Sequence, residues 1–308
     1  MLITKVSKTG GFTAGGKNFA TVVLTNPQNA ALGAQGSTQL EITDLQVSQT
    51  NPIDESSTFA GQHYHDFLNR EPDASGLQFW TNQITACNGD ATCIDLKRQN
   101  VSAAFFLSRE FQETGFYVIR LQRAAFGRLS SDATKRITYL QFLRDAQQVG
   151  KGFVDLQPGA DLILEQNKVA YAQAVAASPA FIARFPTTQT AATFVDALYQ
   201  MAGVTPTAQE RQDAVAVFGA GDTAGRAASL RKVSESASVK NAEFASAFVL
   251  SEFFGYLRRN PTDRPDNNDD GYQFWLNKLN QFGGNYITSE MIRAFILSSE
   301  YRKRFGNS

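Results

Sequence analysis

Arg70 to Ile84 reads REPDASGLQFWTNQI, and Arg259 to Leu279 reads RNPTDRPDNNDDGYQFWLNKL. The two stretches share one phrase, Arg-x-Pro followed by Gly-x-x-Phe-Trp, and they contain both tryptophans of the chain, Trp80 and Trp275. Internal similarity of this kind is typical of a fold assembled from copies of one supersecondary unit. The sequence therefore predicts a repeat architecture, which by itself indicates no reaction.

Weaker copies of the opening of this phrase lie between the two strong ones. The first copy opens with YHDFLNREPD at 64–73, and LQRAAFGRLSSD at 121–132 matches it in an apolar pair, an arginine and a closing aspartate. FVDALYQMAGVTP at 194–206 matches the same opening more faintly. The middle of the chain therefore carries the repeat in degenerate form.

The closing part of the unit also recurs. VSAAFFLSREFQETG at 101–115 aligns with MIRAFILSSEYRKRFG at 291–306, and SPAFIARFP at 178–186 is a reduced form of the same phrase. We expect three to four degenerate helical units.

Phe, Leu and Ala recur three and four residues apart through most of Thr58 to Phe305, a spacing typical of amphipathic helices. Gly15 to Leu45 instead alternates Thr, Val and Ile with polar residues around a turn-rich centre, which predicts two strands of a hairpin. The expected fold class is mainly α, a degenerate helical repeat array with a short N-terminal β-hairpin.

We expect four segments along the chain. They are a hairpin and linker at 1–50, a first helical repeat with a cysteine loop at 51–117, degenerate middle repeats at 118–244, and a last repeat with an Asp-rich loop at 245–308.

The composition excludes several classes of partner. Lys plus Arg and Asp plus Glu number 29 each, so the chain has no global positive field for nucleic acid or an anionic membrane surface. No run of about 18 apolar residues predicts a membrane span, and no apolar core of a signal peptide precedes residue 35. Any export signal is therefore expected upstream of this sequence.

Cys87 and Cys93 are the only cysteines, and they lie in the polar stretch ACNGDATCID. Such a pair closes a small disulfide ring in an oxidising compartment or stays as free thiols, whereas zinc would need further ligands. We favour the disulfide, which would place the protein outside the cell or on its surface.

The phrase with Tyr64, Phe67, Arg70, Gly76 and Trp80, followed by AFFLSREF, resembles a bacterial domain of unknown function, family 4214. The pattern from Phe254 to Trp275, followed by AFILSSEYRKRFG, fits the same family after the insertion TDRPDNND, so the resemblance implies two clear copies. Members are similar to helical linker domains of light-harvesting antennae and often accompany calcium-binding repeats in exported proteins. The resemblance implies no chemistry.

The stretch KNFATVVLTNPQNAALGAQGSTQLEITD at 17–44 resembles the last two strands of the Calx-beta domain, an extracellular β-sandwich. Two strands cannot bury a face of their own, so they must pack on the helical body, pair with another chain, or end a domain cut from a longer protein. We expect the last of these.

An Asp-rich loop is the strongest candidate for a metal site. Its oxygen-bearing residues are Asp263, Asp266, Asn268, Asp269 and Asp270. Asp266, Asn268, Asp270 and Gly271 stand at the first, third, fifth and sixth positions of a calcium loop, but Asn277 stands where that loop needs a bidentate glutamate. We expect calcium with ligands borrowed from elsewhere; turn formation and helix capping are the alternatives.

Glu71 and Asp73 form a second, weaker metal candidate in the first copy. The favoured interpretation is that Asp73 caps the following helix, and that Arg70 and Arg259 pair with nearby carboxylates. His63 and His65 are the only histidines, and residues two apart on a helix point in different directions, so we expect surface or core-edge histidines rather than a zinc site.

These patterns predict a secreted or cell-surface calcium-binding helical module for interaction or scaffolding. Its partner would be an unknown protein, glycan or small molecule. The alternative hypothesis is a calcium-dependent hydrolase of a small ester, a lactone such as an acyl-homoserine lactone, or a glycoside. No nucleophile elbow, Walker loop or dinucleotide fingerprint occurs in the sequence, so its catalytic residues are unknown.

Overall fold

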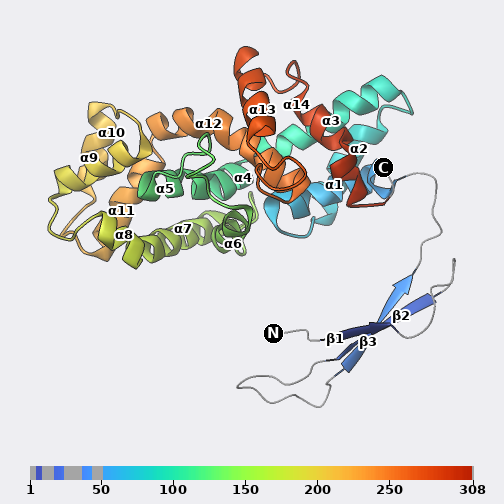
Figure 1. Ribbon diagram of the computed structural model, residues 1–308, viewed down its shortest axis with the longest axis horizontal. Coiled ribbons are helices and arrows are strands. Elements are labelled where there is room, and N and C mark those ends of the chain that lie inside the picture. The colour runs from blue at the N-terminus through green and yellow to red at the C-terminus, as the bar shows by residue number, and fades with distance from the viewer. Residues whose placement is uncertain (1–4, 9–16, 24–36, 44–50, 307–308) are drawn as a thin grey trace. The chain divides into compact units, whose positions relative to one another are not determined.

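A computed structural model describes residues 5–8, 17–23, 37–43 and 51–306. The chain divides into two compact parts, Met1–Asp54 and Glu55–Ser308. The larger part is a helical body, so the prediction of a mainly α fold is confirmed (Figure 1).

The smaller part contains a three-stranded antiparallel sheet in the order β1 (Lys5–Lys8), β2 (Lys17–Val23) and β3 (Ser37–Thr43). Lys17 of β2 is opposite Thr43 of β3, and Val23 is opposite Ser37. The residues that connect the strands lie outside the described residues. A short 3₁₀ helix, η1 (Pro52–Asp54), precedes the helical body.

The helical body consists of four units of similar layout, here called repeats I to IV. Repeat I contains α1 (Ser56–His63), the π-helix η2 (Tyr64–Leu68), α2 (Ala74–Thr85), α3 (Ala91–Leu107) and α4 (Arg109–Glu113). Repeat II contains α5 (Gly115–Phe126), α6 (Tyr139–Gly150), α7 (Ala160–Ala176) and α8 (Pro179–Arg184). Repeat III contains α9 (Ala191–Ala202), α10 (Ala208–Ala216), α11 (Thr223–Ser234) and α12 (Ala237–Glu252). Repeat IV continues α12 through the π-helix η3 (Phe253–Leu257) into α13 (Asp270–Gln281), α14 (Met291–Leu297) and α15 (Ser299–Lys303).

The first helix of every repeat ends at a residue with left-handed backbone. These residues are Asn69, Gly127, Gly203 and Arg258, with φ of 54°, 66°, 63° and 57°. Left-handed caps satisfy the last carbonyls of a helix and turn the chain away from its axis, and glycine and asparagine adopt them at the lowest cost. Arg258 adopts this conformation despite its Cβ.

A serine marks the boundary between the last two helices of every repeat. In repeat I, Ser108 Oγ donates to Phe105 O at 2.8 Å and accepts from Phe111 N at 3.1 Å. Ser178, Ser236 and Ser298 make the same pair of hydrogen bonds in repeats II, III and IV. Such a side chain ends one helix and caps the next, so the serine fixes the angle between them. We call these four residues the hinge serines.

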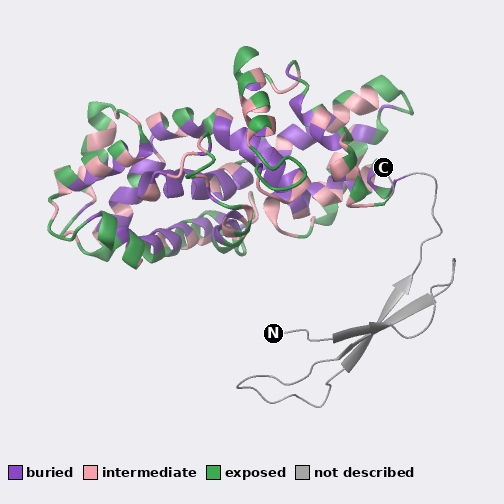
Figure 2. Ribbon diagram, in the orientation of Figure 1, coloured by how far each residue is buried: buried purple, intermediate pink, exposed green. Residues whose placement is uncertain are grey.

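The repeats associate in two pairs, I with IV and II with III. Elements of repeats I and IV contact each other through η2 with η3 and α3 with α14, whereas α5 contacts α9 and α7 contacts α11 (Figure 1). Buried positions line the inner faces of all these helices (Figure 2). The helices of the body are therefore packed together through their buried faces.

Buried polar groups join repeats I and IV. The ring of His63 is fully buried; its Nδ1 donates to Phe59 O at 2.7 Å, and its Nε2 accepts from Ser102 Oγ at 2.5 Å. Tyr256 of η3 is hydrogen-bonded to the same serine. His63 is thus a core residue rather than the surface or core-edge residue expected from the sequence, because an aromatic layer of both repeats surrounds its ring.

Asp66 forms the charged part of the same junction. Its carboxylate accepts from Arg258 at 2.7 Å and from Arg304 at 2.7 and 3.0 Å.

Within the described part of the chain, the helices are too short or too polar for any of them to cross a membrane.

Candidate functional site

The Asp-rich loop is held by arginines from inside and outside its own repeat. Asp266 accepts from Arg259 at 2.8 Å, and Asp269 accepts from both terminal nitrogens of Arg136 at 2.6 and 3.2 Å. Arg136 lies in the loop between α5 and α6, so this contact joins repeat IV to repeat II. Two of the five predicted calcium ligands therefore have their negative charge balanced by a guanidinium.

The other three predicted ligands make local bonds. Asp263 accepts from Asn260 N at 2.9 Å, Asn268 Nδ2 donates to Asp270 at 2.8 Å, and Asp270 N donates back to Asn268 Oδ1. Nowhere in residues 51–306 does the structure gather three or more His, Cys, Asp or Glu side chains in a way that could hold a metal ion. Calcium in this loop stays a prediction.

The corresponding residues of repeat I form a cap. Asp73 is the N-cap of α2 and accepts from Gly76 N at 2.7 Å, while Glu71 lies 3.5 Å from His65. Hydrogen bonds from Gly76 and Ser75 lower the pKa of Asp73, as is usual for a cap carboxylate at the positive end of a helix. Asp73 and Glu71 thus do not converge on one point.

A disulfide joins Cys87, which lies just after α2, to Cys93 in the first turn of α3. The bridge closes the loop between these two helices.

Repeats I and IV contain the same ion pair. In repeat I, Arg70 Nε and Nη2 donate to the two carboxylate oxygens of Glu110 at 2.6 and 3.0 Å. In repeat IV, Arg259 makes the same two bonds to Glu300, again at 2.6 and 3.0 Å. The arginine directly follows the left-handed cap, and the glutamate lies two residues after the hinge serine.

Repeat II keeps the arginine of this pair and lacks the glutamate. Arg128 follows the cap Gly127, and the residue two positions after the hinge serine Ser178 is Ala180. Arg128 Nη1 donates to Gln141 Oε1 at 2.5 Å. Its guanidinium therefore has no carboxylate partner among the described residues.

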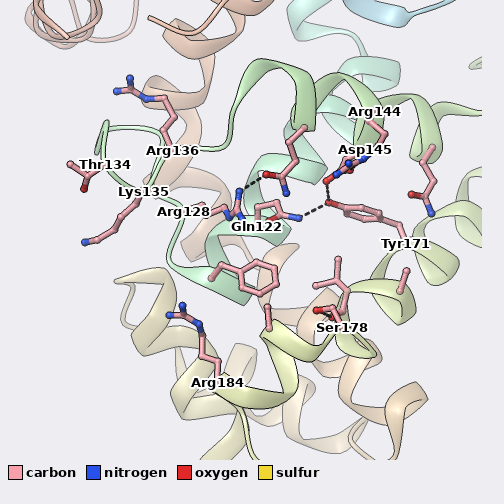
Figure 3. A pocket seen from close by; sticks show the side chains of 16 residues that line it. Gln122, Arg128, Thr134, Lys135, Arg136, Arg144, Asp145, Tyr171, Ser178 and Arg184 are labelled. Carbon is pink, nitrogen blue, oxygen red and sulfur yellow. Dashed lines mark hydrogen bonds and ion pairs between the residues drawn. The ribbon is translucent and has the colours of Figure 1, made fainter. Parts of the chain in front are cut away.

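A cavity of about 660 Å³ lies at this position and is built entirely from repeat II. Its wall contains both Arg128 and Ala180. Figure 3 shows the side chains around it, which come from α5, the following loop, α6, α7 and α8. The lining residues are Gln122, Phe126, Arg128, Thr134, Lys135, Arg136, Gln141, Arg144, Asp145, Gln148, Tyr171, Ala174, Val175, Ser178, Ala180 and Arg184.

Positive charge dominates this wall. Arg128, Lys135, Arg136, Arg144 and Arg184 line it, whereas Asp145 is its only acidic residue. Asp145 accepts from Tyr171 at 2.9 Å and from Arg144 at 3.1 Å, and Gln122 donates to the same tyrosine at 2.8 Å (Figure 3). Arg136 is bound to Asp269 and Lys135 to Asp132, which leaves Arg128 and Arg184 without a carboxylate partner among the described residues.

The arginines of the three repeats differ in their electrostatic environment. Burial acts to lower the pKa of Arg70 and of Arg259, but hydrogen bonds and the charge of Glu110 and Glu300 outweigh it, so both pKa values are raised. Burial dominates for Arg128, and its pKa is lowered. A negative group beside Arg128 would reverse that penalty.

Sequence comparison alone had identified the arginine of repeat II but not its cavity. LQRAAFGRLSSD aligns Arg128 with Arg70, and SPAFIARFP aligns Ser178 with Ser108. The signal for the unpaired arginine lies two positions after the serine, where repeat I has Glu110 and repeat II has Ala180. Which side chains face it across the chain was not readable from the alignment.

The family comparison agrees with the first repeat. Residues 48–115 match the model of a family described as Domain of unknown function (DUF4214), which confirms the predicted resemblance for this segment. Neither a curated protein nor a solved structure matches the chain. The basic cavity lies outside the matched segment.

Proposed function

We propose that this protein is a helical binding module whose ligand is anionic and occupies the basic cavity of repeat II. The observation that carries the proposal is Arg128, a partly buried guanidinium that faces a cavity without a carboxylate partner among the described residues. Burying an unpaired cation is unfavourable, and an anion that enters the cavity removes this cost.

The size and lining of the cavity support a small ligand. About 660 Å³ falls within the range of roughly 300 to 1,000 Å³ usual for small-molecule sites. Phe126, Ala174, Val175 and Ala180 supply apolar contacts, while Arg144 and Arg184 add positive charge. The lining favours binding over catalysis, because its one carboxylate, Asp145, is already bound to Tyr171 and Arg144.

Isothermal titration of a panel of anions into the purified protein tests this proposal. We expect binding that weakens with rising salt and is lost in the double variant Arg128→Gln and Arg184→Gln. Arg211→Gln is the matched control, because Arg211 is paired with Asp196 on an exposed surface and does not line the cavity. Equal binding by the double variant and the control would sink the proposal.

Calcium binding by Asp263, Asp266, Asn268, Asp269 and Asp270 is a separate proposal, supported by the spacing of these residues. Titration of calcium into chelator-treated protein, with the double variant Asp266→Asn and Asp270→Asn as comparison, tests it. The hydrolase hypothesis needs calcium-dependent turnover of an ester, lactone or glycoside, and a panel of these substrates with and without chelator tests that.

We also propose that repeat IV is a second copy of the family that matches repeat I. Its support is structural: the ring centroids of Phe274 and Trp275 lie 5.0 Å apart, and those of Phe79 and Trp80 lie 4.8 Å apart.

Export from the cell is proposed on the basis of the Cys87–Cys93 disulfide. The Calx-beta origin of the N-terminal hairpin is proposed on its sequence alone.

A further inference from the structure

We propose that the cavity of repeat II recognises the carboxylate of a small organic acid, which takes on Arg128 the place that Glu110 and Glu300 take in repeats I and IV. This inference rests on the proposed function and names the ligand class.

The two intact pairs give the geometry of the missing group. In both, the glutamate accepts from Nε and Nη2 of the arginine, one oxygen to each nitrogen. This edge of a guanidinium is planar and presents two parallel donors, which match the two oxygens of a carboxylate. The fold therefore builds one carboxylate-binding fork twice from the same two positions.

In Arg128, as in Arg70 and Arg259, Nη1 is the nitrogen that donates to an acceptor other than the glutamate of the pair. Nη1 of Arg70 donates to the nearby Glu71 O at 3.1 Å, and Nη1 of Arg259 donates to Asn260 O at 3.1 Å. Nη1 of Arg128 instead donates to the side chain of Gln141 in α6, at 2.5 Å. The Nε and Nη2 edge is thus the part of Arg128 left without a partner among the described residues.

The glutamate is replaced by a residue that leaves room. Ala180 lacks the arm that would carry a carboxylate toward Arg128, and both residues line the one cavity. A ligand that supplies this carboxylate would have its body beside Phe126, Ala174 and Val175, which form the apolar part of the wall. Arg184 and Arg144 are placed to meet a second polar or anionic group.

The cavity favours a small molecule over a side chain of another protein. Its walls come from four helices and one loop of a single repeat, and Figure 3 shows the labelled side chains surrounding it from several sides. The volume of about 660 Å³ matches that of a compact ligand, and the residues that would contact it come from this one repeat.

The test uses three carboxylates with different bodies and two other anions: glutarate, glucuronate and 3-phenylpropionate against inorganic phosphate and sulfate. Each is titrated into the wild-type protein, Ala180→Glu and Ala180→Gln. The introduced glutamate can form the internal pair of repeats I and IV, so we expect it to weaken carboxylate binding roughly tenfold or more. Ala180→Gln has nearly the same volume without the charge, and binding to it should fall less.

A second variant keeps the test valid if Ala180→Glu does not fold. Arg128→Lys preserves the positive charge and removes the two-donor edge, so carboxylate affinity should again drop roughly tenfold. Binding of phosphate or sulfate but of none of the three carboxylates would overturn this inference and leave the proposed function standing. Binding of none of the five anions would count against both the proposed function and this inference. Equal carboxylate affinity in Ala180→Glu and Ala180→Gln would overturn the assignment of the ligand carboxylate to Arg128.

Discussion

Repeats I and II place an arginine at the same point, directly after a left-handed helix cap, and use it differently. In repeat I, Arg70 forms an ion pair with Glu110, whose side chain is only 8% exposed. In repeat II, Arg128 faces a cavity because Ala180 stands where the glutamate would be. The comparison teaches that the same arginine is a structural partner where a glutamate faces it and a candidate ligand-binding group where an alanine stands instead.

Repeat IV shows that the same pair varies in burial as well as in presence. Glu300 is 34% exposed, so water partly solvates the carboxylate that Arg259 binds. The three repeats therefore form a series from a buried pair, through a partly exposed pair, to an unpaired arginine. Substitutions that remove the glutamate from one repeat, or introduce it into another, test this comparison.

Glu110→Ala should have the largest effect, because it converts repeat I into the state of repeat II. Removing one partner of a buried ion pair leaves an uncompensated charge, and we expect a loss of roughly 3 kcal/mol in the free energy of unfolding. Urea denaturation measures it. A loss below about 1 kcal/mol would place this pair with ordinary surface pairs and weaken the comparison.

Acid should destabilise the junction of repeats I and IV through His63. Burial lowers the pKa of this histidine from 6.5 to about 4, so between these two pH values the unfolded chain takes up a proton that the folded chain does not. Stability is fully present above pH 6.5 and is lost as pH falls toward 4, by roughly 2 to 3 kcal/mol. Urea denaturation across this range measures the loss.

His63→Gln should flatten that dependence, because it removes the buried titrating ring. A pH dependence that survives in His63→Gln would assign the acid sensitivity to other groups.

The equivalent position in repeat IV is Glu252, and we expect it to act in the opposite direction. Burial raises the pKa of its carboxyl well above the usual value, and neither oxygen has a hydrogen-bond partner in the described part of the chain. Above its ordinary pKa the unfolded chain releases a proton that the folded chain keeps, so stability falls as pH rises. Glu252→Gln should reduce that fall in stability between pH 5 and pH 8. Thermal unfolding of the variant and the wild-type protein at these two pH values measures it.

Glu300→Ala should cost less than Glu110→Ala, about 1 to 2 kcal/mol, because the side chain of Glu300 is more exposed to water than that of Glu110. The two variants are compared in one urea series with Glu165→Ala, which removes an exposed partner of Arg231, as the surface reference. If Glu300→Ala is the costlier of the two, burial does not set the strength of the repeated pair.

Ala180→Glu should have the smallest effect on stability and the opposite sign. It gives repeat II the ion pair of repeats I and IV, and we expect the free energy of unfolding to rise by about 0.5 to 1 kcal/mol. Differential scanning calorimetry beside Ala180→Gln measures the change. A lower melting temperature for Ala180→Glu than for Ala180→Gln would mean that the introduced carboxylate does not reach Arg128.

Much of the helical body was predictable from local patterns. Arg70, Arg128 and Arg259 follow residues that end a helix, and Ser108, Ser178 and Ser298 stand at matched places in the closing phrases. Caps and turns depend on residues a few positions apart, so a linear pattern records them. The burial of His63 was not predictable, because it results from packing against Tyr256, a residue far along the chain.

The sequence by itself determined the helical character, since it depends on short-range spacing. Tertiary structure alone decided which charges meet across different repeats. It paired Asp269 of repeat IV with Arg136 of repeat II and brought Arg128 and Ala180 to the wall of one cavity. The physical reason is that an ion pair or a cavity depends on distances in space, which the packing of α5 to α8 sets and the order of residues does not.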